Sequence, residues 1–276
     1  PAWNFDADTV TNDITLYAKW VAGSGIAYKV EHYQQELDGT YPSAAKETDS
    51  DLTGTTGASL SVGNGITLKD YPGFEYDKLE PASPTIAADD STVVKVYYKR
   101  KMITVTFRLN EGNISGNTGD VVERGKYGAP LTAPTAPTLN KTGYTLSGWQ
   151  PAPPAPALSA TFPAADAIYT AQWVASSGTQ YKVKHYQQNL NDDGYPALHT
   201  DIDHKTGTTG QNATVTLKHY TGFKTGTYTA TTIAADGSTV VEVRYEREKY
   251  AVRFNVDGSA GGSIAVTAVT GGSVTS

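Results

Sequence analysis

Short runs in which apolar and polar residues alternate follow one another along most of the chain, and one such run occurs twice. The first copy, AKWVAGSGIAYKVEHYQQ, spans residues 18–35, and the second, AQWVASSGTQYKVKHYQQ, spans residues 171–188. In each copy a strand-like run ends at a tryptophan, a Gly/Ser hinge follows, and a second strand-like run begins at a tyrosine. Trp20 and Trp173 are 153 residues apart (173 − 20 = 153). This spacing is too long for one solenoid repeat and fits a pair of small domains.

Two kinds of segment alternate along the chain. We call the tryptophan-ended segments A-type and the segments that follow each hinge B-type. We predict the closing part of an A-type segment at 1–22, B-type segments at 27–100 and 179–247, a complete A-type segment at 101–175, and the opening part of another at 248–276. Because the pattern starts and stops inside A-type segments, we expect the chain to be an interior piece of a longer protein.

Period-two alternation between Gly, Pro, Asn and Asp residues predicts strands along most of the chain. The one helix candidate is the short run 43–51, and the proline-rich run 150–156 is expected to be an exposed polyproline-like loop. The expected strands cover residues 14–20, 28–35, 52–62, 73–76, 91–99, 103–109, 143–149, 168–173 and 250–254. The fold class is therefore mainly β, with small modules and little helix. Few linker residues separate consecutive modules, so we expect an elongated tandem array with stiff joints.

The two B-type segments can be compared with each other, and their last strands differ with a period of two. Alternate positions are identical, Thr-Val-Val-Tyr at 92, 94, 96 and 98 and again at 239, 241, 243 and 245, whereas Lys95, Tyr97 and Lys99 become Glu242, Arg244 and Glu246. Identical positions are expected to face the core and variable ones to face outward. Two changes reverse charge together, since Glu31 becomes Lys184 and Lys95 becomes Glu242. We therefore predict that the first and last strands are neighbours and that these charges face each other.

Composition narrows the classes of partner. The net charge is −6 and no basic patch appears, which argues against nucleic acid or an anionic membrane surface as a partner. No apolar run of about 18 residues is present, so we expect no membrane insertion in this segment. The chain has no cysteine and 18 tyrosines against 6 phenylalanines. Small modules of this kind must be stabilised by packing instead of disulfides, and tyrosine suits a one-sided sheet because its hydroxyl can stay wet.

The A-type pattern resembles a known repeat. WNFDADTVTNDITLYAKW at 3–20 resembles the closing half of the Listeria–Bacteroides repeat, also called the internalin B-repeat, and the stretch from KMITVTFRLN to IYTAQW resembles a whole one. The B-type pattern, with YKVEHYQQELDGTY, LTGTTG, YPGFEYD and TIAADDSTVVKVYYKR, looks like a mucin-binding-protein repeat of bacterial surface proteins. The resemblance implies β-grasp-like modules whose first and last strands are adjacent and parallel. It also implies an adhesin displayed outside a bacterium, at the cell surface.

Groups that could carry catalysis are not arranged for it in the sequence. There is no cysteine and no nucleophile, metalloprotease or phosphate-loop motif. His32 and His185 recur, but on the predicted inward face of a strand, where a structural histidine is the expected role. We predict no enzymatic activity and no cofactor.

Metal ligation is a weaker alternative at three places. The run from His199 to His204 holds four candidate ligands in six residues, but the first B-type copy has no histidine there. Calcium could be bound at 191–194 or at 89–90, although Asp-Gly sequences are above all turn formers. We predict no metal site.

Ligand binding has one candidate surface, formed by outward positions that are identical in both copies. A tyrosine flanked by amides could stack on a sugar and hydrogen-bond its hydroxyls. These candidate residues are Lys29, Tyr33, Gln35, Lys182, Tyr186 and Gln188. Two readings stay open: a non-enzymatic stalk that presents a binding region, or direct binding of mucin-type glycans or host glycoproteins by the B-type segments. The incomplete A-type ends could also associate head to tail between molecules.

Overall fold

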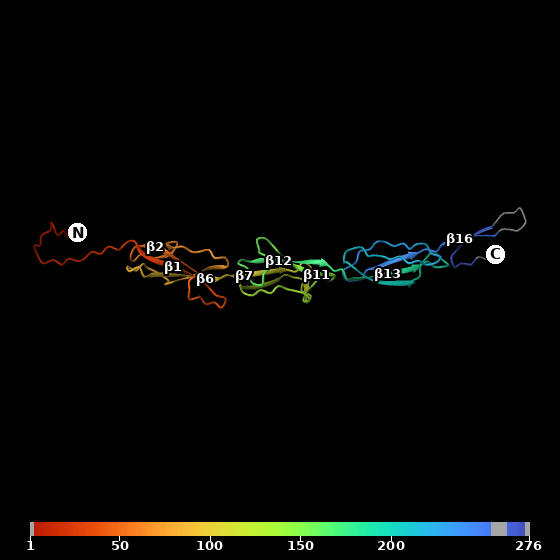
Figure 1. Cartoon of the computed structure of the whole chain (residues 1–276), viewed down its shortest axis with the longest axis horizontal. Helices are drawn as coiled ribbons and strands as arrows, with labels where there is room; N and C mark the ends of the chain where they lie inside the picture. The colour runs from red at the N-terminus through yellow and green to blue at the C-terminus, as the bar shows by residue number, and fades with distance from the viewer. Residues whose placement is uncertain (1–2, 255–263, 274–276) are drawn as a thin grey trace. The chain divides into compact units, whose positions relative to one another are not determined.

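The computed structural model describes residues 3–254 and 264–273, and within these ranges all regular structure is β (Figure 1). The prediction of a mainly β fold is confirmed. No helix in the described part of the chain is long and apolar enough to cross a membrane. The chain divides into two compact units, one made of residues 1–106, 122–132 and 153–168 and the other of residues 107–121, 133–152 and 169–276.

The first B-type segment forms a four-stranded sheet with its first and last strands in the centre. Those strands, β1 and β6, run parallel, with Tyr28 opposite Thr92 and Gln34 opposite Tyr98. This is the β-grasp-like arrangement that was expected. The strand order is β2-β1-β6-β5, with β1 at Ile26–Gln34, β2 at Glu47–Gly54, β5 at Phe74–Glu80 and β6 at Thr92–Arg100. Two short strands, β3 (Ser61–Val62) and β4 (Gly65–Ile66), pair beside it.

One face of this sheet carries the hydrophobic core. Inward residues of β1 and β6 pack against apolar side chains from the loops between β2 and β6. The buried cluster consists of Tyr28, Val30, Leu60, Ile66, Ile86, Val94, Val96 and Tyr98. Inward and outward positions alternate along β6, as the comparison of the two copies predicted for Val94 and Val96.

The second B-type segment repeats the central parallel pair. Its sheet has the order β14-β13-β15, with β13 at Thr179–Gln187, β14 at Asp201–Gly207 and β15 at Val240–Tyr245. Where the first copy has β5, isolated bridges from Phe223 to Arg247 and from Thr227 to Arg244 appear instead. The buried cluster is built from the matching residues, namely Tyr181, Val183, Ala213, Ile233, Val241, Val243 and Tyr245.

The complete A-type segment supplies another four-stranded sheet, in the order β11-β12-β7-β9. The proline-rich run begins on its edge strand, because β11 includes Gln150 and Pro151, and continues as a loop. The strands are β7 (Met102–Arg108), β9 (Val121–Lys126), β11 (Tyr144–Pro151) and β12 (Ala167–Ala175). The short strands β8 (Asn113–Ile114) and β10 (Leu139–Asn140) pair with each other.

The last A-type segment is described only in part. Two of its strands, β16 (Lys249–Phe254) and β17 (Ile264–Val269), form an antiparallel pair. Residues 255–263 and 274–276 of the predicted segment lie outside the described residues. Each sheet takes its strands from one predicted segment, while the module boundaries themselves stay a prediction.

Three expected elements are wrong. The strand expected at 52–62 is interrupted, because β2 ends at Gly54 and the next strand is β3 (Ser61–Val62). The helix candidate at 43–51 is instead a bend at 43–46 followed by the start of β2 at Glu47, where Asp49 bonds the buried His32 of the neighbouring strand. The strand expected at 14–20 is absent (Figure 1). The Trp20 side chain is 90% exposed. In the complete A-type segment the matching residues form β12, which pairs with β11. Residues 3–13 contain no strand that could play the part of β11, so alternation alone does not produce a strand there.

The predicted charge register is confirmed. Glu31 lies opposite Lys95, and Lys184 lies opposite Glu242. Both acidic groups bond to other partners, however: Glu31 accepts a hydrogen bond from the Tyr33 hydroxyl, and Glu242 lies 3.2 Å from Arg244. The oppositely charged residues are therefore neighbours across the two strands, but the acidic groups make their shorter polar contacts with Tyr33 and Arg244.

Candidate ligand-binding surface

The two tyrosines of the candidate surface are buried, contrary to the expected exposure. Tyr33 is 6% exposed and Tyr186 is 9% exposed. The Tyr33 ring stacks on Tyr97 with 5.2 Å between ring centroids, and its hydroxyl donates to Glu31 at 2.5 Å. That hydrogen bond, followed by burial, raises the pKa of Tyr33 to about 12. Neither ring offers an open face for stacking on a sugar.

A loop after the first strand of each B-type copy packs on the cross-strand neighbour of the candidate tyrosine, which is Tyr97 for Tyr33 and Arg244 for Tyr186. In the first copy Tyr41 packs edge-on against Tyr97 at 4.6 Å, and its hydroxyl donates to Asp77. In the second copy the matching Tyr195 lies under Arg244, with 5.2 Å from the guanidinium carbon to the ring centroid. Tyr-Pro follows the first strand in both copies, at 41–42 and at 195–196, and also occurs at 71–72. The sequence signal for this loop was therefore the dipeptide together with its place after the first strand.

The glutamines of the candidate surface bind backbone. The Gln35 side chain donates to the carbonyl of Gly39 and accepts from the N–H of Arg100. Gln188 donates to the carbonyl of Asp193 and accepts from the N–H of Arg247. Of the six candidate residues, only Lys29 and Lys182 are exposed. Whether the surface binds a ligand stays a prediction, but most of its shared residues already have internal partners.

A buried polar network lies on the inner side of the first B-type sheet, around His32. The Lys69 N–H donates to the Tyr98 hydroxyl at 2.9 Å, which leaves the hydroxyl proton for His32 Nδ1 at 3.0 Å. The other ring nitrogen, Nε2, then donates to Asp49 at 3.2 Å. Lys69 Nζ completes the set, 2.8 Å from Asp49 and 3.0 Å from Glu47. Every polar atom of the His32 ring is satisfied.

The second copy contains the same network. His185 is fully buried and lies 2.9 Å from the Tyr245 hydroxyl through Nδ1 and 3.2 Å from Asp203 through Nε2. Lys218 donates its N–H to Tyr245, and its ammonium bonds both Asp203 and Asp201. The inward position predicted for the two histidines is confirmed. Their Asp and Lys partners were missed, although Asp49/Asp203 and Lys69/Lys218 are also identical between the copies.

The network keeps its carboxylates charged. A hydrogen bond from Lys69 lowers the pKa of Asp49, and a hydrogen bond from Lys218 lowers the pKa of Asp203. Although a tyrosine, a histidine and an aspartate in a row could suggest a nucleophile with its base, Tyr98 is only 2% exposed and His32 is fully buried. A substrate cannot reach these atoms in this conformation, so the arrangement suits a structural role.

The residues weighed as metal ligands are dispersed or already bonded. Asp201 and Asp203 hold Lys218, His204 pairs across the strands with Lys182, and the His199 ring packs near Tyr186. At the turns, Asp192 accepts from Asn189 and Gly194, and Asp89 accepts from Ser91. Residues 3–254 and 264–273 contain no group of three or more side chains placed to hold a metal ion.

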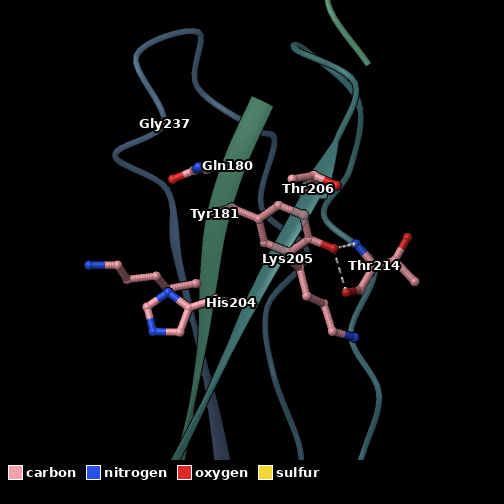
Figure 2. Close-up of a pocket in the computed structure, with 8 residues that line it drawn as sticks. Gln180, Tyr181, His204, Lys205, Thr206, Thr214 and Gly237 are labelled. Atoms are coloured by element: carbon pink, nitrogen blue, oxygen red, sulfur yellow. Dashed lines mark hydrogen bonds between the residues drawn. The ribbon is translucent and has the colours of Figure 1, made fainter. Parts of the chain in front are cut away.

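A shallow hollow of about 580 Å³ lies beside Tyr181 in the second B-type copy (Figure 2). The Tyr181 hydroxyl donates to the Thr214 carbonyl at 2.8 Å and accepts from the Thr214 N–H at 3.1 Å. Figure 2 shows Gln180 and His204 on one side of the strands and Tyr181 on the other. The lining groups therefore do not converge on one point, and three of the exposed ones, Gln180, Lys182 and His204, form a polar surface.

Comparison with known proteins supports part of the family resemblance. Residues 1–19 and 104–153 match the family model of the Listeria-Bacteroides repeat domain (List_Bact_rpt). The matched stretches fall in the A-type segments and amount to less than half of the chain. The B-type segments lie outside the match, so their resemblance to mucin-binding-protein repeats stays a prediction.

The chain is also similar to a bacterial protein of Evansella cellulosilytica described as "Putative membrane protein". The two are 25% identical over 153 residues. The aligned region covers 54% of this chain and 20% of that relative. The chain thus spans about a fifth of the length of the curated relative that it matches.

Proposed function

We propose that the chain is a non-enzymatic segment of a bacterial cell-surface protein, a stalk that holds a binding region away from the cell. The repeat match and the described membrane-protein relative support a surface location. The observation that carries the proposal is the repeated internal network, since polar residues retained in both B-type copies bind their own module. Polar residues that are identical in both copies and bond within their own module indicate that these residues stabilise the fold.

The connections between sheets support the stalk. One residue separates β6, which ends at Arg100, from β7, which begins at Met102. Three residues separate β12 from β13, and three separate β15 from β16. Connections this short leave little chain to act as a flexible linker.

The proposal can be tested by displaying a reporter domain on a bacterial surface with and without this chain between anchor and reporter. We expect the inserted chain to increase binding of reporter ligand carried on large beads, which cannot approach the wall closely. A flexible Gly/Ser linker of the same residue number is the control, because it is expected to span less distance. Equal capture through both inserts would contradict a stalk.

Direct binding of mucin-type glycans by the B-type segments is the second candidate. It is favoured by the exposed polar surface of Gln180, Lys182 and His204, whose counterparts in the first copy are Ala27, Lys29 and Asp51. The test is the whole chain on an array of mucin glycans and host glycoproteins. Binding that is lost in both Lys182→Ala and His204→Ala would support this candidate. If the parent chain binds nothing on the array, this candidate is rejected and the stalk is the proposal that remains.

A further inference from the structure

An arginine at the end of each B-type segment bonds a turn of the segment that follows. In the first copy Arg100 donates through Nε to the Gln35 carbonyl at 2.8 Å and through a terminal nitrogen to the Tyr127 carbonyl at 2.8 Å. Its guanidinium lies 5.1 Å from the centroid of the Phe74 ring. Tyr127 belongs to the turn after β9, so a single side chain joins two sheets within one compact unit.

The second copy builds the same joint. Arg247 donates through Nε to the Gln188 carbonyl at 2.9 Å and through a terminal nitrogen to the Thr270 carbonyl at 2.6 Å. The guanidinium lies 4.8 Å from the Phe223 ring centroid. Thr270 follows β17 as Tyr127 follows β9, and all of these residues belong to the other compact unit.

Backbone hydrogen bonds repeat as well. The Lys101 N–H donates to the Gly73 carbonyl at 2.9 Å, and the Tyr127 N–H donates to the Lys101 carbonyl at 3.0 Å. The corresponding bonds of the second joint run from Glu248 to Gly222 at 2.8 Å and from Thr270 to Glu248 at 3.0 Å. The same main-chain hydrogen bonds therefore accompany the arginine in both joints. This repetition indicates that the two joints are built in the same way.

Each joint also needs a glycine on the B-type side. A methyl group at Gly73 would lie 2.3 Å from the Tyr127 ring, and one at Gly222 would lie 2.1 Å from a Thr270 side-chain carbon. The turn that docks is therefore in direct contact with the glycine backbone. Both glycines have positive φ, 83° and 79°, a conformation that favours glycine in any case.

We propose that Arg100 and Arg247 lock each B-type sheet to the following segment. They do so by donating hydrogen bonds to main-chain carbonyls of that segment and not to its side chains. The docked residue is tyrosine in one joint and threonine in the other, yet both arginines bond its carbonyl and the carbonyl of the matching glutamine. Arg247 Nε also donates to the Asn189 carbonyl at 3.1 Å. The planar fork of arginine suits two carbonyls held at fixed positions. A B-type segment can thus be followed by segments of different sequence, provided that a turn presents its carbonyl there. This inference does not depend on the proposed surface function.

The test is a distance measurement across the first joint by double electron–electron resonance. Because the chain has no cysteine, spin labels can be placed only where wanted, at Asp51→Cys on β2 and Glu123→Cys on β9, both exposed. We expect one narrow distance distribution in the parent and a distribution at least twice as wide in Arg100→Ala. Arg108→Ala, an exposed arginine on β7, should leave the width unchanged.

Gly73→Ala gives an independent test of the lock. Its matched control is Gly57→Ala, which has a similar φ of 78° but no atom within 4 Å of the added methyl group. Both variants introduce left-handed strain, and only Gly73→Ala should broaden the distances. Amide NMR signals of β1 and β6 establish that the first sheet remains folded in each variant.

The proposal is overturned if Arg100→Ala lowers the stability of the first sheet while the distance distribution stays narrow. The arginine would then stabilise its own B-type segment without joining it to the next one. It is equally overturned if Gly57→Ala broadens the distances as much as Gly73→Ala does. The same experiment on Arg247→Ala, with labels at Thr206→Cys and Thr267→Cys, must give the same outcome if the two joints are equivalent.

Discussion

The two B-type copies, residues 27–100 and 179–247, share their inner side and differ at some positions of their outer side. Both contain the central parallel strand pair and the histidine network. On the outer side, Tyr97 of the first copy is replaced by Arg244 of the second, and each packs against the tyrosine of the covering loop. The covering contact is preserved while its chemistry changes from aromatic pairing to a cation–π contact.

The copies also differ in the fourth strand. Thr92 follows Phe74 by 18 positions, and Thr239 follows Phe223 by 16 (92 − 74 = 18; 239 − 223 = 16). The shorter connection carries isolated bridges where the first copy has β5. The central pair and its polar network thus define the module, whereas an edge strand can be reduced without losing them.

The largest effect is expected from removing the histidine that both copies keep. His32→Ala and His185→Ala should each destabilise their own sheet by about 3 kcal/mol, because a cavity is left and a tyrosine hydroxyl and a carboxylate lose a partner. Urea unfolding followed through the amide NMR signals of each sheet measures this. Lys29→Ala, on the exposed side of β1, should change stability by less than about 0.5 kcal/mol. A neutral His185→Ala would show that the second copy does not depend on the network.

A smaller loss is expected where a glycine lies against the core. A methyl group on Gly54 would lie 2.3 Å from an Ile86 carbon, and one on Gly207 would lie 2.5 Å from an Ile233 carbon. Gly54→Ala and Gly207→Ala should therefore each lower the free energy of unfolding by about 1–3 kcal/mol. Gly178→Ala, with no atom within 4 Å of the methyl group, is the matched control. Unequal losses at the two sites would mean that the cores pack differently.

Acid should weaken both copies through the same carboxylates. Lysine hydrogen bonds lower the pKa values of Asp49 and Asp203. A lowered pKa in the folded state contributes stability that is present above the unfolded value of about 3.9 and is lost as the pH falls through the folded value. Chemical denaturation from pH 7 to pH 2 should therefore show a decline below about pH 4. Lys69→Met should reduce this decline in the first sheet and leave the second unchanged; an unaltered decline would contradict the assigned cause.

The smallest effect concerns the outer side. Arg244→Tyr should change the stability of the second sheet by less than about 0.5 kcal/mol, because a tyrosine already packs on the loop tyrosine of the first copy. Arg244→Ala should destabilise it by about 0.5–1 kcal/mol, since the cation–π contact is lost. If both variants are equally destabilised, the two outer contacts are not interchangeable.

Much of the strand pattern was predictable from the sequence, because alternation and the internal duplication fix which residues face inward. The parallel neighbours β1 and β6 followed from a double charge reversal at Glu31 and Lys95, even though those two groups do not form the closest ion pairs. The start of β2 was missed because its inward residue is Asp49, a half-buried carboxylate that is bonded by His32 and Lys69.

The candidate surface was harder to predict, since period two separates two faces but does not say whether a loop covers one of them. Tyr33 lies on the outward face as expected, and the loop carrying Tyr41 nevertheless helps to bury that face. Nor can alternation at 14–20 specify a strand without a partner. Contacts between residues distant in the chain, such as Arg100 with Tyr127, have no local sequence pattern.

Small-angle X-ray scattering of the whole chain tests the stalk most directly. A compact globule of this length would have a radius of gyration of about 19 Å. If the modules follow one another as a stalk with locked joints, we expect roughly twice that value, with little dependence on salt. A value near that of a compact globule would mean that the segments fold back on one another, and would contradict the account.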